Sequence, residues 1–345
     1  MIDQAWPDTD LERVPSCPVC GAVERELLHS GLTDRVFGVA PGQWDLWRCE
    51  ACSSGYLDPR PTPSSVGRAY EAYFTHVAKD HRVVRRVGKL RTLLHDLING
   101  YQNHRYGLAL EHAGIAGRWL LPLLPSLRAA ADAECRHLPP LPASGGRLLD
   151  VGCGDGGFLA LARQGGWSVE GIDFDEGGVA AARSRGLSVR LGGIDLFDNS
   201  DERFDVITIS HVIEHVHDPL ETLRCIYRLL KPGGMLWLET PNINSLGAKR
   251  FGVDWFGLDP PRHLVLFNRD SLSQALREVG FRSIRQAWRG MSVFDVYAAS
   301  ESVASGHSGM AGSYGGRPPE HAIRAEFMEM FRASSREFLT FLALK

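Results

Sequence analysis

The chain has 345 residues, of which 44% are hydrophobic and 23% charged, and its formal net charge is −3. This composition is that of an ordinary globular protein, without the basic excess typical of a nucleic-acid binder. The first residues, MIDQAWPDTDLER, are acidic and have no apolar core, and no run of about 18 apolar residues follows. We therefore expect a cytoplasmic protein without a secretory signal or a membrane span.

Residues 1–65 contain two C-x-x-C pairs separated by a long inner loop. Two such pairs can hold one zinc ion with four thiolates, and a ribbon of this size seldom folds without its metal. Four sulfur ligands leave no open position for water, so we expect a structural zinc. The inner loop offers Phe37, Trp44 and Trp47 for a small core. The predicted zinc ligands are Cys17, Cys20, Cys49 and Cys52.

Residues 66–143 form a predicted helical segment that ends at the turn-rich LPPLPASGG. Residues 81–98, HRVVRRVGKLRTLLHDLI, have apolar side chains at helical spacing and a basic opposite face. We expect these helices to cap the ligand site of the following domain or to pack between domains. The basic face is either solvated or in contact with an anionic lipid surface. The apolar positions are Val83, Val84, Val87, Leu90, Leu94, Leu97 and Ile98.

Residues 144–345 alternate between predicted strands and helices. This alternation predicts an α/β fold with a parallel sheet covered on both faces. We expect a surface loop over residues 304–319 and a last edge strand at REFLTFLALK, residues 336–345. Helices are expected at 154–166, 176–186, 218–234 and 271–281. The expected strands are RLLDVG (147–152), SVEGIDF (168–174), SVRLGG (188–193), FDVITIS (204–210), MLWLETP (235–241) and RSIRQAWRG (282–290).

A glycine-rich turn, LLDVGCGDGGFLALA, joins the first of these strands to its helix. Gly152, Gly154 and Gly157 satisfy G-x-G-x-x-G, which by itself is a weak sign of dinucleotide binding. Asp150, two residues before the first glycine, would repel a pyrophosphate and would hold a cationic ligand. S-adenosylmethionine has an ammonium group, a sulfonium and no phosphate. The glycines would let the backbone approach such a ligand closely.

Two further acidic residues follow the next two strands. Asp173 ends the second strand, about 20 residues after the glycines, where a carboxylate accepts hydrogen bonds from ribose hydroxyls. Phe174 beside it is placed to pack on an adenine, and Asp195 after the third strand is placed to meet the adenine amino group. Three carboxylates in register at consecutive strand ends indicate a nucleoside site.

LLDVGCGDGGF, GIDFD, FDVITISHVIEHVHDP, LKPGG and LETPN resemble the class I S-adenosylmethionine-dependent methyltransferases, from about residue 145 to 290. The resemblance implies a Rossmann-like sheet of seven strands with a reversed last strand, and S-adenosylmethionine as cofactor. It implies that Cys153 contributes mostly its backbone. By this resemblance the cofactor contacts are Asp150, Gly152, Cys153, Gly154, Asp173, Phe174, Asp195 and Ser210.

RCEACSSGYLDPRPTPSSVGRAYEAYF resembles the N-terminal segment of bacterial zinc-ribbon methyltransferases that act on sugars or other small molecules. The resemblance covers residues 15–75. Ser53 stands where a glycine is usual, which does not affect the predicted ligands.

HVIEH, residues 211–215, matches the H-x-x-E-H pattern of inverted zinc peptidases. It lies between a predicted strand end and a helix that begins at Asp218 and Pro219, so we interpret it as a loop and not as a zinc-binding helix. Three interpretations remain. Glu214 and His215 hold the loop by local hydrogen bonds, which we favour for Glu214; His211 or His215 takes a proton from a substrate; or the pair supports metal-assisted transfer, as its resemblance to some ubiquinone-type O-methyltransferases suggests.

WFGLDPPRHLVLF, residues 255–267, contains the other candidate base, His263. A hydroxyl acceptor must lose its proton as the methyl group arrives, and a histidine suits that role. The alternative is that His263 caps the following helix. Trp255 and Phe256 are expected to form an aromatic wall, and Arg262 to grip a carboxylate or phosphate.

The sequence thus predicts a zinc ribbon (1–65), a helical cap or linker (66–143) and a class I methyltransferase domain (144–345). The predicted activity is S-adenosylmethionine-dependent O-methylation of a sugar, a glycan precursor or another small metabolite. C-methylation of a nucleotide-linked keto sugar is the alternative within the class. A zinc-ribbon protein that modifies or binds RNA is the alternative from another class, and the net charge argues against it.

Overall fold

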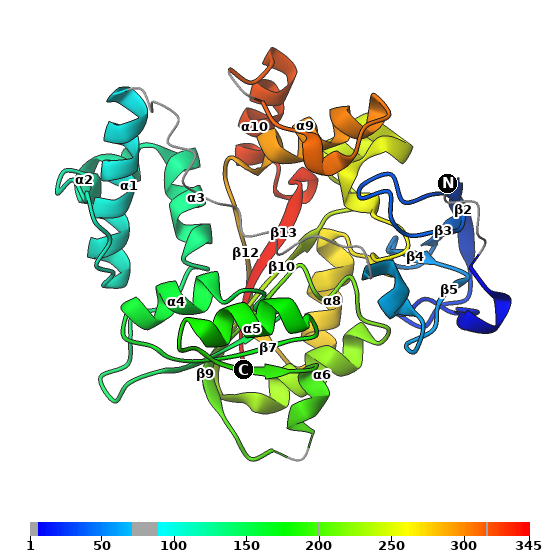
Figure 1. Ribbon diagram of the computed structural model, residues 1–345, viewed down its shortest axis with the longest axis horizontal. Helices are drawn as coiled ribbons and strands as arrows, with labels where there is room; N and C mark the ends of the chain where they lie inside the picture. Colours follow the sequence, from blue (N-terminus) through cyan, green and yellow to red (C-terminus); the bar gives the residue numbers. More distant parts are fainter. Residues whose placement is uncertain (1–5, 71–88, 199, 315–316) are drawn as a thin grey trace.

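The computed structural model describes residues 6–70, 89–198, 200–314 and 317–345. Figure 1 shows a central twisted sheet with helices packed on it, an N-terminal sheet (blue) on one flank and a group of helices (cyan) on the other.

The central sheet is mixed and has seven strands. In spatial order these are β12 (Arg282–Ala287), β13 (Phe338–Leu344), β10 (Leu230–Pro241), β9 (Phe204–Ser210), β6 (Arg147–Val151), β7 (Ser168–Asp173) and β8 (Ser188–Leu191). Only β13 runs against its neighbours, β10 and β12. The predicted α/β class, with a Rossmann-like seven-stranded sheet and a reversed last strand, is confirmed.

The position of β13 differs from the prediction of an edge strand, because it lies between β10 and β12. Residues 339–343 are all buried. A strand covered on both faces needs a continuous apolar run, and FLTFLAL supplies one. The edge belongs to β12, whose RSIRQA sequence is mostly polar and largely exposed.

Four helices cover the sheet close to where they are predicted: α4 (Gly157–Gln164), α5 (Glu176–Ser184), α6 (Pro219–Leu229) and α8 (Arg269–Val279). The Asp218 carboxylate caps α6 by accepting from the Glu221 backbone N–H at 2.9 Å, and Pro219 is the first helical residue. The predicted helix over 218–234 is too long. Its chain turns extended at Leu230, the first residue of β10.

Three helices near the carboxyl ends of the strands were not predicted: α7 (Leu246–Phe251), α9 (Ser292–Ala304) and α10 (Glu320–Phe331). Part of the tract predicted as a loop, 304–319, is also structured. Its 3-10 turn η7 (Gly309–Ala311) begins with a backbone hydrogen bond from Gly309 to the Val36 carbonyl, 2.9 Å long. Residues 315 and 316 of this tract lie outside the described residues.

The helical segment contains α1 (Lys89–Tyr106), α2 (Gly117–Leu120), the 3-10 turn η3 (Leu121–Leu123) and α3 (Pro125–Glu134). Tyr101 and Tyr106 of α1 both donate to the Asp132 carboxylate of α3, at 2.8 and 2.7 Å. The predicted apolar positions Val83, Val84 and Val87 lie outside the described residues. In the part of the chain that the structure describes, no helix has the length and apolarity needed to span a membrane.

The N-terminal sheet has four strands, and one of them comes from the far end of the chain. Its order is β11 (Val265–Leu266), β4 (Gly55–Leu57), β3 (Trp44–Cys49) and β2 (Arg25–Leu32). A small pair, β1 (Leu11–Glu12) with β5 (Arg60–Pro61), lies beside it. Of the aromatic residues expected in its core, Trp44 is buried, and Trp47 packs under the Arg25 guanidinium at 4.2 Å.

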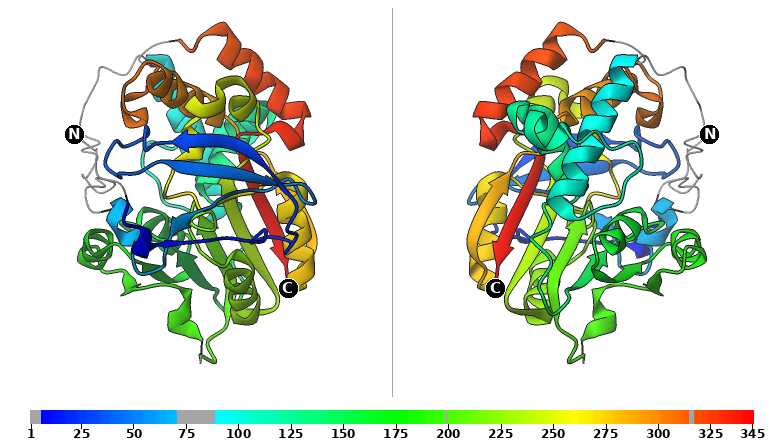
Figure 2. Two further views of the ribbon diagram at one scale, coloured as in Figure 1. Left: turned by 90° about the vertical axis from the view of Figure 1, so that its right-hand side faces the viewer. Right: turned by 90° about the vertical axis from the view of Figure 1, so that its left-hand side faces the viewer.

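Because β11 follows His263 directly, the N-terminal sheet is built onto the segment that carries a candidate base. Side chains add to this connection. Asn268, which caps α8, donates to the Cys52 carbonyl at 2.7 Å. Arg60 donates to the His217 carbonyl at 3.1 Å, and the Nε2 atom of His217 lies 2.9 Å from the Pro61 carbonyl. Figure 2 shows the N-terminal sheet (blue) lying across the central one.

Candidate active site

The loop from β6 to α4 has the left-handed backbone that glycine adopts without strain. Gly152 and Gly154 have φ angles of 73° and 54°. A Cβ at position 152 would lie 2.2 Å from a methyl carbon of Val212, so packing also requires glycine there. The backbone N–H groups of Gly152 and Cys153 donate to the Ile172 carbonyl at 2.9 and 3.1 Å, which holds the loop against β7.

Asp150 is fully buried at the end of β6 and is paired with a residue that was not predicted. It forms an ion pair with Arg136 and accepts from the Thr208 hydroxyl at 2.9 Å. Burial raises the pKa of Asp150, and the Arg136 guanidinium opposes this shift. Arg136 lies in a polar turn after α3, where the sequence offers no motif that would have identified it.

One oxygen of this carboxylate, Oδ2 of Asp150, is buried and has no hydrogen-bond partner among the described residues. Leaving a buried acceptor unpaired is costly, so the site suits a ligand that supplies a donor. An ammonium group would satisfy the free oxygen, and the adjacent Arg136 would attract a carboxylate. The amino-acid end of S-adenosylmethionine has both groups, so the residues present fit this cofactor.

Asp173 lies at the end of β7 and also shapes the glycine loop. Its Oδ2 atom accepts from the Gly154 N–H at 2.7 Å, and its Oδ1 atom accepts from the Asp175 N–H at 2.8 Å. Each carboxylate oxygen can accept more than one hydrogen bond, so both remain able to meet hydroxyl groups. The side chain is only partly buried, which leaves a ligand access to it.

Phe174 and Asp195 lie together beside the ends of β7 and β8. A Cβ built at Gly193 would lie 2.6 Å from the Phe174 ring and 2.6 Å from the Asp195 carboxylate, so both side chains surround this glycine. Phe174 is 76% exposed, which is unusual for so large an apolar side chain. An exposed ring next to an acceptor is the arrangement that an adenine would use, as predicted.

Cys153 is buried and offers no sign of reactivity. A Cβ at Gly171 would lie 2.6 Å from its sulfur, so the thiol packs against β7. Burial raises the pKa of this thiol above its usual range, which disfavours the nucleophilic thiolate. The placement fits the expectation that Cys153 contributes mainly its backbone.

His211 directly follows Ser210, the last residue of β9, and lies between two buried carboxylates. Its Nδ1 atom is 3.3 Å from Glu214 Oε1, and its Nε2 atom is 3.5 Å from Glu239 Oε1. The backbone of His211 is left-handed, with φ of 53°, a conformation that is strained outside glycine. The side chain is 37% exposed, so a substrate can reach it.

The carboxylate of Glu214 is held in place from two sides. Thr240 donates to its Oε2 atom at 2.9 Å, opposite the His211 contact. Burial by itself would raise the pKa of Glu214, but the His211 imidazole and two further histidines hold this pKa below its ordinary value. Glu214 therefore stays ionised and orients His211, in line with the local role that we favour for it.

His263 and His215 pack edge to face beside Glu214, with ring centroids 4.7 Å apart. His263 Nδ1 lies 2.8 Å from the Gly257 carbonyl, and its Nε2 atom is 4.0 Å from Glu214. His215 Nδ1 lies 2.9 Å from the Tyr70 hydroxyl. Burial lowers the pKa of both imidazoles, that of His215 to about 4, so both are neutral at pH 7.

The structure brings one potential ligand atom each from Glu214, His215 and His263 within 4.8 Å of one another. This spacing is compatible with a metal ion, which keeps the metal-assisted interpretation open. His263 does not cap α8, because Asn268 holds that position with hydrogen bonds to the backbone N–H groups of Asp270 and Ser271. At 8% exposure it is also less accessible than His211.

Arg262 does not have the ligand-binding role that was expected, because its side chain is completely buried. Its guanidinium donates to the carboxylates of Asp34 and Asp259 and to the Ala69 carbonyl. The Phe37 ring lies 4.6 Å away. Arg262 therefore joins the N-terminal sheet to the loop before His263.

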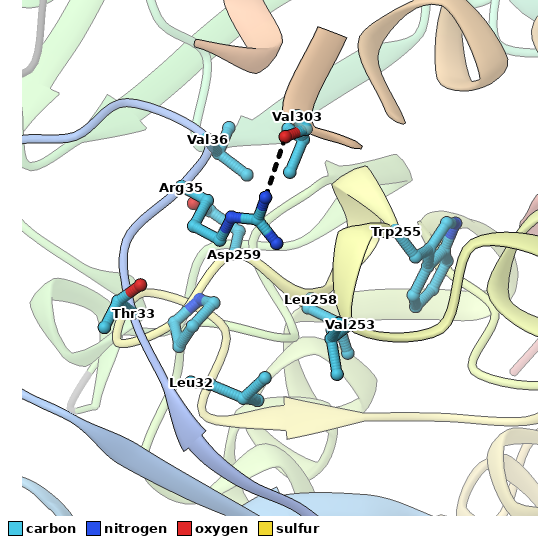
Figure 3. A pocket seen from close by; sticks show the side chains of 10 residues that line it. Leu32, Thr33, Arg35, Val36, Val253, Trp255, Leu258, Asp259 and Val303 are labelled. Carbon is cyan, nitrogen blue, oxygen red and sulfur yellow. Dashed lines mark hydrogen bonds between the residues drawn. The ribbon is translucent and has the colours of Figure 1, made fainter. Parts of the chain in front are cut away.

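The expected aromatic wall does not enclose an acceptor-sized cavity either. Trp255 is buried, and its indole N–H donates to Glu337 at 3.3 Å. Figure 3 shows the adjoining pocket, where Arg35 reaches across to the Val303 carbonyl at 2.9 Å. This pocket has a volume of about 10 Å³, room for roughly one water molecule.

The four cysteines of the two C-x-x-C pairs come together in one cluster. Cys17 and Cys52 have sulfur atoms 3.6 Å apart, and Cys20 and Cys49 have sulfur atoms 3.5 Å apart. All four sulfurs lie within 4.8 Å of one another. Zinc–sulfur bonds of about 2.3 Å in a tetrahedron require sulfur separations of about 3.8 Å, so this donor set fits zinc.

Each cysteine pair ends in a tight turn with a left-handed residue. The Gly21 N–H donates to the Cys17 carbonyl and the Ser53 N–H to the Cys49 carbonyl, both at 2.9 Å. The φ angles are 76° at Gly21 and 58° at Ser53. This conformation explains why glycine is usual where Ser53 stands, since a side chain there costs backbone strain.

Comparison with known proteins agrees with this geometry. Residues 126–286, a little under half of the chain, match the family described as "Methyltransferase domain". The ubiquinone biosynthesis O-methyltransferase of Pseudomonas aeruginosa is 39% identical over 108 residues, which cover 29% of this chain and 47% of that protein. That of Pseudomonas fluorescens is 38% identical over the same length. The chain thus spans about half the length of the curated relatives it matches.

Solved structures with a similar fold include an S-adenosylmethionine-dependent methyltransferase from Archaeoglobus fulgidus. It is 22% identical, with a TM-score of 0.45, and the likeness covers 64% of this chain and 93% of that one. The sheet order, the glycine loop and the family match together identify a class I S-adenosylmethionine-dependent methyltransferase domain in this chain.

Proposed function

We propose that this protein transfers the methyl group of S-adenosylmethionine to a hydroxyl group of a small molecule. The observation that supports this most is the position of His211. Its imidazole is partly exposed at the end of β9, on the same edge of the sheet as Asp150 and Asp173, and contacts two buried carboxylates.

The cofactor end of this site is assigned to residues at the ends of three parallel strands. Asp150 Oδ2 and Arg136 hold the amino and carboxylate groups, and Asp173 accepts from the ribose hydroxyls. Phe174 packs on the adenine beside Asp195. The bound cofactor supplies a methyl group that is already activated by the sulfonium, so the protein mainly has to position the two reactants.

The acceptor end is assigned to His211. Glu214, which is ionised, receives the Nδ1 proton of His211 and leaves Nε2 free to take the proton of the acceptor hydroxyl. The 3.5 Å separation between Nε2 and Glu239 is too long for a strong hydrogen bond, so Nε2 is available. Carboxylates on both sides of the ring stabilise the imidazolium that this transfer creates.

For the acceptor we propose a sugar, a glycan precursor or a related metabolite, as the resemblance of the N-terminal segment suggests. The named activity of the curated relatives, O-methylation in ubiquinone biosynthesis, supports a hydroxyl acceptor over a carbon one. C-methylation of a keto sugar and a role on RNA remain the alternatives. A screen of candidate acceptors for S-adenosylhomocysteine release discriminates among them.

Replacing Asp173 tests the cofactor site. Asp173→Ala removes two charge-assisted hydrogen bonds to the ribose, and we expect S-adenosylmethionine affinity to fall at least ~100-fold in calorimetry. The exposed carboxylate of Asp198, near Asp195, provides a matched control, and Asp198→Ala should bind normally. Unchanged affinity in Asp173→Ala would overturn the nucleoside assignment.

Replacing His211 tests the proton transfer separately. We expect His211→Gln to lower kcat by ~10²–10⁴-fold, the usual contribution of a general base, with cofactor affinity unchanged. His263→Gln, which changes the neighbouring buried imidazole, should have a smaller effect on kcat. If His263→Gln abolishes turnover while His211→Gln retains it, the base is His263 and the assignment to His211 is wrong.

A further inference from the structure

Two neighbouring segments expose large apolar side chains that contact no other part of the protein closely enough to bury them. Around α2 and η3, Trp119 is 68% exposed and Leu123 is 74% exposed. On α10, Phe327 and Phe331 are 61% and 70% exposed, and their rings touch edge to face. Apolar groups gathered in this way on a surface mark an interaction site. We call this surface the apolar face and define it as Trp119, Leu123, Leu124, Ile323, Phe327 and Phe331.

The two segments adjoin through the chain that follows β12. A Cβ at Gly290 would lie 2.3 Å from the carbonyl oxygen of Ser126, two residues after Leu124. The next residue, Met291, donates its N–H to Glu326 of α10 at 2.8 Å. In Figures 1 and 2, both segments stand on the same side of the central sheet.

The charges around the apolar face are almost all positive. No acidic residue occurs between Glu111 and Asp132, whereas Arg118 and Arg128 both lie there. The Arg118 guanidinium stacks on Trp119 at 4.7 Å.

On α10 the charges are sorted in the same way. Arg324 and Arg332 are exposed, whereas Glu326 and Glu329 are buried. Glu320, in the first turn, is the acidic residue that remains exposed on this helix.

We propose that the apolar face docks on the surface of an anionic lipid bilayer. Tryptophan and phenylalanine rings favour the boundary between headgroups and acyl chains, and arginines beside them meet lipid phosphates. Protein partners with an acidic rim, or a second copy of this chain, are the competing occupants. A second copy would bring Arg324 and Arg332 against the same cations, which opposes self-association. This proposal goes beyond the methyl transfer and does not depend on it.

Flotation of the full-length protein with lipid vesicles tests the proposal. We expect binding to vesicles of 70% phosphatidylcholine and 30% phosphatidylglycerol. Binding to pure phosphatidylcholine should be at least ~10-fold weaker, because the arginine contribution is lost. Binding to the anionic vesicles should also weaken in high salt. Failure of the native protein to float with anionic vesicles overturns the proposal.

Substitutions locate the binding surface. Phe327→Ser combined with Phe331→Ser should weaken vesicle binding at least ~10-fold, because two buried rings are removed. Val23→Ser, at a position of the ribbon that is 61% exposed, serves as the matched apolar control and should bind normally. Equal loss in Val23→Ser, or no loss in the double variant, contradicts the assignment.

A charge reversal keeps the test decisive if the phenylalanine variant folds poorly. Arg324→Glu should weaken binding to anionic vesicles several-fold, whereas Arg282→Glu, on the exposed edge strand β12, should not. Light scattering across a concentration series examines the competing occupant. Self-association that disappears in Arg324→Glu or in the phenylalanine variant would assign the apolar face to a second copy and refute lipid docking.

Discussion

Arg262→Ala is expected to lower the free energy of unfolding by about 3–5 kcal/mol, the usual cost of breaking a buried ion pair by removing one partner. Arg262, Asp34 and Asp259 are all buried, and the substitution leaves two carboxylates without a counter-ion. Urea denaturation measures the effect. Arg224→Ala, which removes an exposed ion pair with Glu221, should cost less than about 1 kcal/mol.

The two carboxylates of this cluster have different environments, which provides an internal check. Asp34 also accepts from the backbone N–H groups of Phe37, Val39 and Ala40. Burial opposes ionisation, but these donors and Arg262 hold the pKa of Asp34 below its ordinary value. Asp259 lacks such backbone donors among the described hydrogen bonds, and burial raises its pKa to about 6.

Restoring charge balance should therefore act through Asp34. In an Arg262→Met background, Asp34→Asn removes the carboxylate that stays ionised at neutral pH, and should recover part of the lost stability. If Arg262→Ala unfolds at the same urea concentration as the native protein, the cluster does not stabilise the contact between the N-terminal sheet and the catalytic domain.

Cys17→Ser combined with Cys20→Ser should remove the zinc and unfold the N-terminal sheet. Elemental analysis of the native protein should find about one zinc per chain, because the four sulfurs form one site. Zinc binding contributes about 10–16 kcal/mol in zinc-finger peptides, so its loss exceeds what this small sheet can replace. Cys225→Ser, at a buried cysteine outside the cluster, should retain the metal.

The loss should reach the catalytic domain as well. The N-terminal sheet contains β11 and is bonded to Asn268 and Arg262, so its unfolding should also lower the thermal stability of the methyltransferase domain. Zinc retained by the double variant would refute the four-thiolate site. A second equivalent of metal in the native protein would indicate that Glu214, His215 and His263 form a metal site of their own.

Local sequence patterns were sufficient to predict most of the central sheet. Continuous apolar runs such as RLLDV and FDVITIS mark strands buried on both faces, and the glycines between β6 and α4 are required by a left-handed turn. The N-cap at Asp218 was likewise readable, because capping depends on residues only three positions apart. The cysteine spacing predicted a cluster that the structure assembles.

Helices and pairings that depend on distant partners were not predicted. Helix α9 is buried on most sides and lacks a clear polar face, so its sequence has no simple periodic signal. The C-terminal strand was expected at an edge because its neighbours could not be identified from sequence. Arg136 and Asp150 are 14 residues apart, but a turn with left-handed Arg136 is needed to bring them together.

By itself, the sequence determined the class of the domain, the placement of three acidic residues at strand ends and the four cysteine ligands. These features depend on short-range spacing and on the burial pattern of single elements. Only the tertiary structure decided the roles of the histidines and of Arg262. Their neighbours come from β9, β10, β13 and the N-terminal sheet, and burial with specific partners sets their charge and accessibility. That is why Arg262, expected to bind a substrate, lies in the core, while His211 remains within reach of one.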